Sequence, residues 1–402
     1  MDFSEAAARL ETRGMFGITL GLERARELFD RANIDAGKIK FLHIAGTNGK
    51  GSVGAMLQGM LRTAGYRTGF YSSPHLLSVR ERFRMDGLAI PEARFSEIYA
   101  RLEPTADAMK AAGREPTYFE LVTALAAAYF IEEKADFAVW ETGMGGRLDA
   151  TNIVTPEACI ITNVALDHCE YLGNTVAEIA AEKAGIIKPG VPVFGGCELT
   201  KEALDVIRAQ AAKSGAPFEQ SGPVGCLNVK LPLAGPMQRR NYALAELVLK
   251  YLSGKYGFDF ARAARGVETV GWPGRMQRLR GNLWVDGGHN PDGAAAVAET
   301  FAGRRLTVVF GAFRDKEAAA ELQLLEPVAE RFVFVPVPAH GRPSHSAEEL
   351  GAMTSRPWSA AAGVREAVES AGAEETVIVT GSLYLVGETL RNFADEESVL
   401  NI

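Results

Sequence analysis

The feature that most constrains the fold of this chain is a short apolar segment that leads through a glycine-rich loop into a helical pattern. The segment is Phe41-Leu-His-Ile-Ala45, the loop is Gly46-Thr-Asn-Gly-Lys-Gly-Ser52, and the helical pattern runs from Ser52 to Ala64 and ends at Gly65. A buried strand that passes directly into a helix is typical of a parallel α/β sheet. Glycines let backbone N–H groups turn toward phosphate oxygens at the helix N-terminus, where the helix dipole adds positive potential. The pattern therefore predicts an α/β fold with a phosphate-binding loop.

The loop is a variant of the common phosphate loop GxxxxGK[ST]. Its leading segment is shorter, and Gly51 separates Lys50, which supplies positive charge, from Ser52. An ordinary strand-to-helix turn with a surface lysine is the alternative interpretation. The elements on both sides of the loop favour phosphate binding over that alternative.

The length of 402 residues favours two domains, because a single hydrophobic core stops growing at about 250–300 residues. We therefore expect a cleft between two lobes. The net charge of −7 argues against a nucleic-acid-binding surface. The four cysteines form no CxxC pair, the N-terminus lacks the pattern of a signal peptide, and the longest apolar run, 121–131, is too short to span a membrane. These features predict a cytoplasmic protein without nucleic-acid or membrane partners.

Short apolar runs alternate with helical patterns along most of the chain, which predicts a doubly wound first lobe over residues 1–272. Around Phe218 to Pro236 the pattern changes to short strands without helices. This change predicts a small side sheet in the same lobe, before a helix from Met237 to Leu252. The strands predicted for the main sheet are 41–45, 68–71, 137–141, 159–163 and 192–195.

A breaker-rich segment, Val270-Gly-Trp-Pro-Gly-Arg275, precedes a new predicted strand at 283–286. It places a linker at residues 273–281 and a second domain at residues 282–402. Strands at 306–310, 332–335 and 376–380 alternate with helices there, so the second domain is predicted to be a smaller, Rossmann-like α/β unit.

Polar side chains follow several predicted strands, at the positions where open α/β sheets bind ligands. Ser73 follows strand 68–71, Glu141 ends strand 137–141, and His168 follows strand 159–163. A hydroxyl, a carboxylate and an imidazole at such strand ends are able to complete the coordination of a hard cation that holds ATP. Taken singly, each has a plain alternative, because a lone histidine is often structural and a strand-end glutamate is usually solvated.

Lys183 lies in the apolar stripe of a helix predicted to begin near Thr175. Val176, Ile179 and Ala184 recur at helical spacing, and Lys183 shares their face. One interpretation is a lysine that extends from the helix end to solvent. The other is a lysine that is modified, or paired with anions, beside the metal site.

These motifs occur in a fixed order along nearly the whole chain. They are Phe16–Glu23, His43–Ser52, Ser73–His75, Glu81–Arg82, Glu141–Asn152, Asp167–His168, Glu170–Gly173, Glu182–Gly185, Pro273–Arg275, Asp286–Pro291 and Gly381–Tyr384. Together they resemble the folylpolyglutamate synthase/dihydrofolate synthase family, a branch of the Mur ligase superfamily. So many ordered matches make the resemblance specific.

The resemblance implies roles for the matching residues, with Lys50, Lys183 and His168 acting in catalysis. The ATP contacts implied are Thr47, Asn48, Gly49, Lys50, Gly51, Ser52, Asn241, Arg275 and Asp286. The magnesium ligands implied are Ser73, Glu141 and His168, and Lys183 matches a lysine that the family carbamylates to support a second magnesium ion. The pterin substrate would be held by Arg82, Thr117, Tyr118, Phe119, Glu120, Leu148, Asp149 and Ala150, and the incoming glutamate by His289 and Ser382.

The chemistry implied is transfer of the γ-phosphoryl group of ATP to a pterin carboxylate, followed by attack of the glutamate amine on the acyl phosphate. Segments 117–120 and 148–150 favour a bifunctional enzyme. The alternatives are an enzyme that adds only the first glutamate, to dihydropteroate, and one that adds only later glutamates, to reduced folates. The resemblance also implies a monomer.

Three other classes of protein share part of this pattern. A peptidoglycan Mur ligase would need a further N-terminal domain, and 45 residues precede Gly46. A phosphate-loop kinase or ATPase would not need the second lobe, and a non-catalytic module would not need the metal-site residues. His340 and His345 match no known pattern and are predicted to be solvent-side loop residues.

Overall fold

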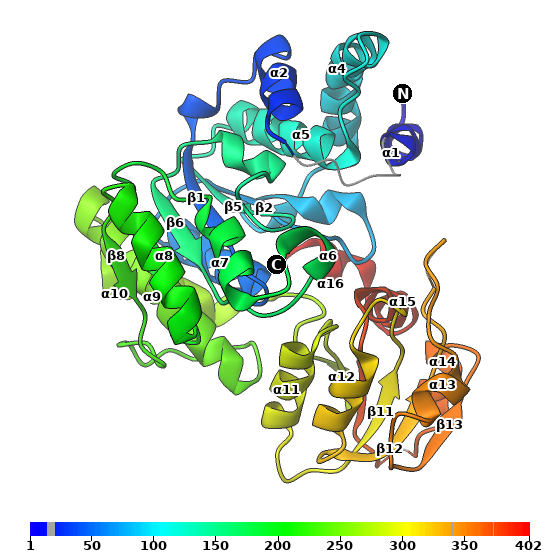
Figure 1. Cartoon of the computed structure of the whole chain (residues 1–402). Coiled ribbons are helices and arrows are strands. Elements are labelled where there is room, and N and C mark those ends of the chain that lie inside the picture. Colours follow the sequence, from blue (N-terminus) through cyan, green and yellow to red (C-terminus); the bar gives the residue numbers. More distant parts are fainter. Residues whose placement is uncertain (14–20, 339–340, 373) are drawn as a thin grey trace. The chain divides into compact units, whose positions relative to one another are not determined.

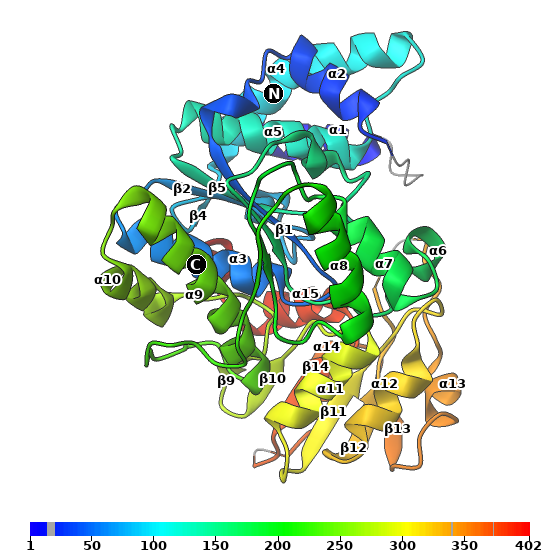
Figure 2. The same cartoon turned by 60° about the vertical axis from the view of Figure 1, so that its left-hand side comes forward.

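The computed structural model describes residues 1–13, 21–338, 341–372 and 374–402. The chain forms two compact units: the first comprises Met1–Lys230, Arg240–Val270 and Asn401, and the second comprises Leu231–Arg239, Gly271–Leu400 and Ile402. Each unit contains its own sheet (Figures 1 and 2), which confirms the predicted two-domain α/β architecture. Most of the motif Phe16–Glu23 lies outside the described residues, as does His340.

The first unit is built on one eight-stranded sheet with the order β4-β3-β2-β5-β1-β6-β7-β8. β3 and β4 pair antiparallel at one edge, and the other pairs are parallel. β1 lies between β5 and β6, so the loop that follows it emerges where the connections diverge, which is the usual ligand position in such sheets. The strands are β1 (Lys40–Ala45), β2 (Thr68–Tyr71), β3 (Phe83–Met85), β4 (Leu88–Ala89), β5 (Phe137–Glu141), β6 (Ala158–Ile161), β7 (Val193–Gly195) and β8 (Phe218–Gln220).

The predicted small side sheet does not form. Phe218–Gln220 joins the main sheet as the edge strand β8, parallel to β7, and residues 221–235 contain no strand. The backbone of that segment is tied to a helix instead, because the Glu246 carboxylate accepts hydrogen bonds from Cys226 N–H (2.5 Å) and Leu227 N–H (2.8 Å). A side-chain anchor therefore replaces the strand pairing that the sequence pattern suggested.

Helices cover both faces of the first sheet (Figure 1). Side chains such as Phe41 and Trp140 pack into the core under α5, and Ala45 packs into the core under α7 and α8. α3 packs against β2 and β5 on the other face, where Gly54 meets the Phe70 ring. The helices are α1 (Phe3–Thr12), α2 (Glu23–Arg31), α3 (Lys50–Thr63), α4 (Glu92–Ala111), α5 (Tyr118–Glu132), α6 (Cys169–Leu172), α7 (Val176–Ala184), α8 (Lys201–Lys213), α9 (Pro236–Tyr256) and α10 (Phe260–Ala264), with single turns η1 (Ala36–Lys38), η2 (Val79–Arg82), η3 (Ala150–Ile153) and η4 (Arg265–Thr269).

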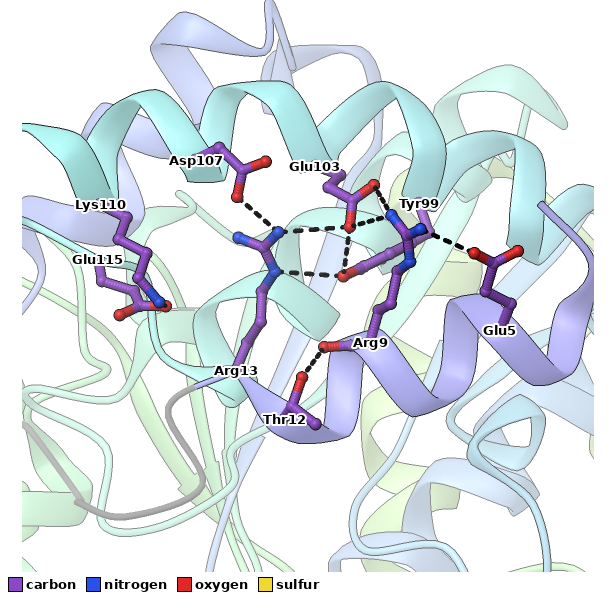
Figure 3. A network of polar contacts seen from close by, with 9 residues as sticks. All are labelled: Glu5, Arg9, Thr12, Arg13, Tyr99, Glu103, Asp107, Lys110 and Glu115. Atoms are coloured by element: carbon purple, nitrogen blue, oxygen red, sulfur yellow. Dashed lines mark hydrogen bonds and ion pairs between the residues drawn. The ribbon is translucent and has the colours of Figure 1, made fainter.

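A polar network fastens the short helix α1 to α4 (Figure 3). The Arg13 guanidinium lies 2.6 Å from an Asp107 oxygen and 3.3 Å from a Glu103 oxygen, and its Nε donates to Tyr99 Oη at 3.2 Å. Arg9 reaches the same Glu103 carboxylate at 3.2 Å. A helix of ten residues is marginal in isolation, so its position depends on these contacts and on the apolar side chains beneath them.

The second unit contains a six-stranded sheet with the order β13-β12-β11-β14-β10-β9, in which only β9 pairs antiparallel. α11 and α12 lie side by side in both views (Figures 1 and 2). Among the described residues of the whole chain, no helix combines the length and the apolar character needed to cross a membrane. The elements are β9 (Gln277–Arg280), β10 (Leu283–Val285), α11 (Pro291–Thr300), β11 (Leu306–Phe310), α12 (Ala318–Leu325), β12 (Ala329–Phe334), α13 (Ala347–Gly351), β13 (Trp358–Ala360), α14 (Val364–Glu369), β14 (Val377–Thr380), α15 (Leu383–Phe393) and α16 (Glu396–Leu400).

Residues 273–281 are not a linker outside the domains. They belong to the second unit, and residues 277–280 form β9, which pairs with β10 through a tight turn at Gly281-Asn282. Gly281 has φ +49°, a left-handed conformation that suits glycine in a hairpin turn. The breakers Pro273 and Gly274 thus precede a hairpin, and the division between the units falls at Val270 and Gly271.

His345 is also less exposed than predicted. Its side chain is only 13% exposed, and Nδ1 lies 3.6 Å from a Glu349 oxygen. The backbone places it there, because His345 N–H donates to Ala312 O at 3.0 Å.

The close approach of α3 to the sheet gives a stability prediction. A Cβ added to Gly54 would lie 2.4 Å from Phe70 Cζ, so Gly54→Ala is expected to destabilise the protein by about 1–3 kcal/mol through overpacking. Gly254→Ala is the matched control: a Cβ there meets nothing within 4 Å, and the change should stabilise α9 by up to about 1 kcal/mol. Urea unfolding measures both, and equal effects of the two substitutions would contradict the prediction.

Candidate active site

The loop Gly46–Ser52 joins β1 to α3 in the conformation of a phosphate loop. Gly49 has φ +83°, which turns the chain into the first turn of α3, where Lys50, Gly51 and Ser52 lie. Lys50 folds back over the loop, with Nζ donating to Gly46 O at 3.0 Å and to Thr47 O at 3.3 Å. The loop thus holds backbone N–H groups and one ammonium group at the carboxyl end of the central strand.

The segment after β6 braces the loop. Asn48 N–H donates to Asn163 Oδ1 at 2.8 Å, and Thr162 Oγ1 donates to Asn48 O at 2.6 Å. Thr47 Oγ1 accepts from Ala165 N–H at 3.1 Å. These contacts fix the loop without any ligand, so its N–H groups are oriented before phosphate arrives.

Asn241, near the start of α9, lies directly against the loop. A Cβ added to Gly49 would be 2.6 Å from Asn241 Oδ1. Glycine at position 49 is therefore required by its positive φ and by this neighbour. The structure brings the loop and Asn241 together, and the family resemblance implies ATP contacts for residues 47–52 and for Asn241.

Glu141 and Ser73 meet beside Lys50. Glu141 ends β5 and is only 3% exposed; its Oε1 lies 4.0 Å from Lys50 Nζ, and its Oε2 accepts from Ser73 N–H at 3.4 Å. In the part of the chain that the structure describes, no group of three or more His, Cys, Asp or Glu side chains is arranged to hold a metal. A carboxylate next to a serine nevertheless fits Mg²⁺, which prefers one or two protein oxygens and takes its other ligands from water and phosphate.

His168 lies beyond the end of β6, the strand on the other side of β1 from β5. It has φ 52°, its side chain is 45% exposed, and its Nε2 is 3.9 Å from an Asp167 oxygen. The imidazole lies on the same edge of the sheet that carries the phosphate loop.

Lys183 is buried in α7, only 3% exposed, which decides between the two interpretations of its place in the apolar stripe. Burial, and to a smaller extent the nearby Lys50 ammonium, lower its pKa to about 7, although the carboxylates of Asp167 and Asp149 oppose both effects. The interpretation of a lysine that extends to solvent is therefore wrong. The side chain lies within electrostatic reach of the phosphate loop and of two acids.

Both carboxylate oxygens of Asp149 accept hydrogen bonds. Oδ1 accepts from Thr151 N–H at 3.0 Å and from Thr151 Oγ1 at 2.5 Å, and Oδ2 accepts from Met144 N–H at 2.9 Å. Burial raises the pKa of Asp149, and these hydrogen bonds lower it. Asp149 thereby fixes both the glycine-rich turn after Glu141 and the start of η3, which contains Ala150 and follows the half-buried Leu148.

A buried histidine completes this arrangement, and the sequence analysis did not identify it. His43 in β1 is fully buried, and its Nε2 lies 2.9 Å from Thr151 Oγ1. Its Nδ1 has no hydrogen-bond partner in the described residues. The available signal was a single polar residue inside an otherwise apolar central strand.

The predicted pterin segment forms the start of α5. Thr117 and Glu120 cap the helix reciprocally, and the buried Glu120 carboxylate lies 3.0 Å from Arg24. Phe119 packs on Gly143, where a Cβ would lie 2.4 Å from its ring, and Tyr118 lies 5.5 Å from the Arg82 guanidinium. The start of α5 therefore contacts Arg82 through Tyr118 and the glycine-rich turn at Gly143 through Phe119.

In the second unit, the ends of β10 and β14 bring the remaining predicted residues together. Burial raises the pKa of Asp286, and the Arg275 guanidinium opposes this shift. The Asp286 carboxylate accepts hydrogen bonds from Met276 N–H and Gly288 N–H, both at 2.8 Å. His289 Nδ1 is 2.9 Å from Gly287 O.

Ser382 caps the N-terminus of α15, and its Oγ accepts a hydrogen bond from Tyr384 N–H at 3.2 Å. The two strand ends meet where Gly381 N–H donates to Gly288 O at 3.0 Å. His289 and Ser382 therefore occupy adjacent loops.

Comparison with known proteins finds a known domain in each unit. The Mur ligase middle domain model matches residues 44–193, and the model of the Mur ligase glutamate ligase domain matches residues 274–383. The chain is 34% identical to the dihydrofolate synthase/folylpolyglutamate synthase of Bacillus subtilis (strain 168), with 96% of this chain and 98% of that protein covered.

Solved structures of related proteins share the fold. Folylpolyglutamate synthase of Mycobacterium tuberculosis complexed with ADP gives a TM-score of 0.89 at 30% identity, with 98% of each chain covered. A second structure is the bifunctional folylpolyglutamate synthase/dihydrofolate synthase of Yersinia pestis c092, complexed with AMPPNP and Mn ion. It gives a TM-score of 0.84 at 30% identity, with 98% of each chain covered. The phosphate loop, the two sheets and the two domain matches define the class of Mur ligases. Within that class, the chain belongs to the dihydrofolate synthase/folylpolyglutamate synthase family.

The burial of Lys183 gives a pH-dependent stability prediction. Between about pH 7, its pKa in the fold, and pH 10.5, the ordinary value, the unfolded chain binds more protons than the folded one, so stability rises with pH. Lys183→Met removes the charge, and in buffer free of carbon dioxide it should stabilise the protein at pH 6 by up to about 4 kcal/mol, a gain that vanishes by pH 10.5. Denaturant unfolding at several pH values measures this. Lys213→Met, at an exposed position of α8, should show no such trend.

Proposed function

We propose that this chain is an ATP-dependent carbon–nitrogen ligase that adds L-glutamate to dihydropteroate and to the γ-carboxyl group of reduced folates. The observation that carries the proposal is the grouping of the phosphate loop, Lys50, Glu141 and Ser73 at one edge of the first sheet, in a chain of this family. Such a grouping suits phosphoryl transfer, which depends on positioning and on charge neutralisation.

The reaction has two steps in which the chain's residues have separate tasks. The loop N–H groups and Lys50 hold the phosphates of ATP and neutralise charge that develops on the transferred group. The γ-phosphoryl group moves to the substrate carboxylate, which gives an acyl phosphate and ADP. The glutamate amine then attacks the acyl carbon, and phosphate leaves as the amide bond forms.

Ser73 and Glu141, with His168, would hold a divalent cation, whose positive charge supports phosphate binding when it is present. The M. tuberculosis and Y. pestis relatives carry ADP, or AMPPNP with an Mn ion, which supports a nucleotide and a divalent cation in this family. Magnesium as that cation, and a second magnesium ion, are part of the proposal.

Lys183 is proposed to be carbamylated. Because burial lowers its pKa to about 7, a large fraction of its side chain is a neutral amine at physiological pH, and only the neutral amine reacts with carbon dioxide. The carbamate would replace a buried cation by an anion next to Lys50, which relieves the repulsion between the two lysines.

The other residues keep the roles that the family resemblance implies. Asn241, Arg275 and Asp286 are proposed ATP contacts, and His289 and Ser382 are proposed glutamate contacts. Residues 117–120 and 148–150, with Arg82, are proposed to hold the pterin part of the substrate. A cytoplasmic location, a monomeric state and the absence of nucleic-acid partners stay predictions from the sequence.

The function is tested by ADP release with dihydropteroate and with tetrahydrofolate, each with and without L-glutamate. We expect release that requires glutamate with both substrates. Release that is independent of glutamate would favour a phosphate-loop ATPase or kinase. Activity with only one substrate would restrict the enzyme to that reaction.

The role of Lys183 is tested by Lys183→Ala, which should reduce ligation by at least about 1,000-fold while leaving ADP binding intact, because an electrostatic group near the transferred phosphoryl is lost. The control is Lys213→Ala, which should retain full activity. A carbon-13 signal from labelled bicarbonate should appear on the unaltered protein and not on Lys183→Ala. Near-normal turnover of the variant would contradict the carbamate.

A further inference from the structure

The segment that follows β6 places a buried hydroxyl against the phosphate loop. Thr162 is only 5% exposed, and its N–H donates to Ala45 O at 3.0 Å, so its backbone is anchored to β1. Its Oγ1 lies directly on the loop, because a Cβ added to Gly46 would be 1.8 Å from this oxygen. The Thr162 side chain therefore projects from a fixed backbone into the base of the loop.

The same segment occupies the first donors of the loop. Thr47 N–H donates to Asn163 O at 3.1 Å, and Asn48 N–H donates to Asn163 Oδ1 at 2.8 Å. The Thr47 hydroxyl, which has one proton, donates to Ala165 O at 3.2 Å and accepts from Ala165 N–H at 3.1 Å. The backbone donors that the loop can offer to phosphate therefore begin at Gly49.

The peptide between Asn48 and Gly49 can point in two directions. Gly49 has φ 83° and ψ −11°, the values of the third residue of a type II turn. A type I turn reverses this central peptide, and glycine accepts either form because it has no Cβ. The orientation of this one peptide decides whether the loop presents the Gly49 N–H or the Asn48 carbonyl to an anion.

The Thr162 hydroxyl holds this peptide in one orientation, because Oγ1 donates to Asn48 O at 2.6 Å. In a planar trans peptide the C=O and N–H groups lie on opposite sides, so the Gly49 N–H points away from Thr162. α3 begins directly after Gly49, and the first N–H groups of a helix have no acceptor within the helix. Such grouped N–H dipoles are unfavourable without an anion, and the hydroxyl bond opposes the reversal that would relieve them.

We propose that Thr162 is a positioning residue for ATP: its hydroxyl keeps the Asn48–Gly49 peptide in the orientation that directs the Gly49 N–H at a phosphate oxygen. This inference rests on the proposed function, in which the loop holds ATP, and adds a residue from outside the loop. Thr162 does not donate to phosphate itself, since its hydroxyl proton is committed to Asn48 O.

The test measures ADP binding by calorimetric titration for two variants that differ by one hydroxyl. Thr162→Ser keeps the donor and should bind ADP within about threefold of the unaltered protein. Thr162→Ala removes the donor and should bind ADP about 10–100-fold more weakly, as expected when a hydrogen bond to a charged group is lost. Both variants lack the threonine methyl group, so the comparison isolates the hydroxyl.

Thr389→Ala is the matched control. Thr389 is also buried, and its Oγ1 donates to Leu385 O at 2.7 Å within α15, so the substitution removes a comparable hydrogen bond from the second unit. ADP affinity should stay unchanged in this variant. If Thr162→Ala does not fold, Thr162→Val removes the hydroxyl while keeping the shape of the side chain, and the same loss of ADP affinity is expected.

Steady-state kinetics separate positioning from a general loosening of the fold. Thr162→Ala should raise KM for ATP at least about 10-fold, because the phosphates lose the preorganised Gly49 N–H. KM for dihydropteroate and KM for L-glutamate, measured at saturating ATP, should stay unchanged. Loosening of the fold would raise all three KM values, and serine at position 162 would not restore ATP binding alone.

Three results would overturn the proposal. One is equal ADP affinity of Thr162→Ser and Thr162→Ala, and another is equal weakening of ADP binding in Thr162→Ala and Thr389→Ala. The third is a rise in all three KM values of Thr162→Ala. Failure of the proposed function looks different, because the unaltered protein would then bind ADP but would release none from ATP in a glutamate-dependent manner.

Discussion

The burial of Lys183 next to Lys50 is the constraint on which the rest of the first unit's site depends. When both lysines are protonated, the two ammonium groups repel each other, and the low-dielectric surroundings strengthen that repulsion. Asp149 and Asp167 lie close enough to Lys183 to oppose this effect. Asp149 in turn fixes the turn at Met144, which directly follows the strand that ends in Glu141. One buried charge thus links the helix α7, the glycine-rich turn and the phosphate loop.

The parts of this molecule that the sequence predicted depend on local patterns. The phosphate loop, the strands around it and the place of Lys183 on the apolar face of α7 follow from glycine positions and from helical spacing over a few residues. The predicted side sheet does not form, because the Glu246 carboxylate, twenty residues away in the chain, accepts the hydrogen bond of Cys226 N–H. The linker predicted at residues 273–281 instead contains β9, because residues 277–280 pair with β10, and the breakers at 270–275 carry no signal of that pairing. The contact of Arg82 with Tyr118 could not be predicted, because Tyr118 lies in a different element, at the start of α5.

Several residues that the family resemblance assigns to substrate also hold the fold. Thr117 and Glu120 cap α5, and Glu120 also pairs with Arg24 of α2. Both oxygens of Asp149 are occupied by donors of its own loop. The segments that would meet the pterin are therefore rigid before a ligand arrives, which lowers the entropy that binding must overcome. The same coupling means that a substitution at these positions changes stability and substrate affinity together, so loss of activity alone does not identify a contact residue.

The proton positions around Asp149 explain why a histidine occupies the central strand. Thr151 has one hydroxyl proton, and its oxygen is 2.5 Å from Asp149 Oδ1, which as a carboxylate only accepts. The hydroxyl therefore accepts from His43 Nε2–H, and the proton of His43 is fixed on that nitrogen. Burial lowers the pKa of His43 to about 3, so Nδ1 stays unprotonated and lacks a partner among the described residues, at a cost of about 1–3 kcal/mol. Leucine in its place would avoid that cost but would leave the Thr151 hydroxyl without its donor. The histidine thereby directs the Thr151 hydroxyl proton at Asp149 Oδ1, which adds one hydrogen bond to those that Asp149 accepts from Thr151 N–H and Met144 N–H.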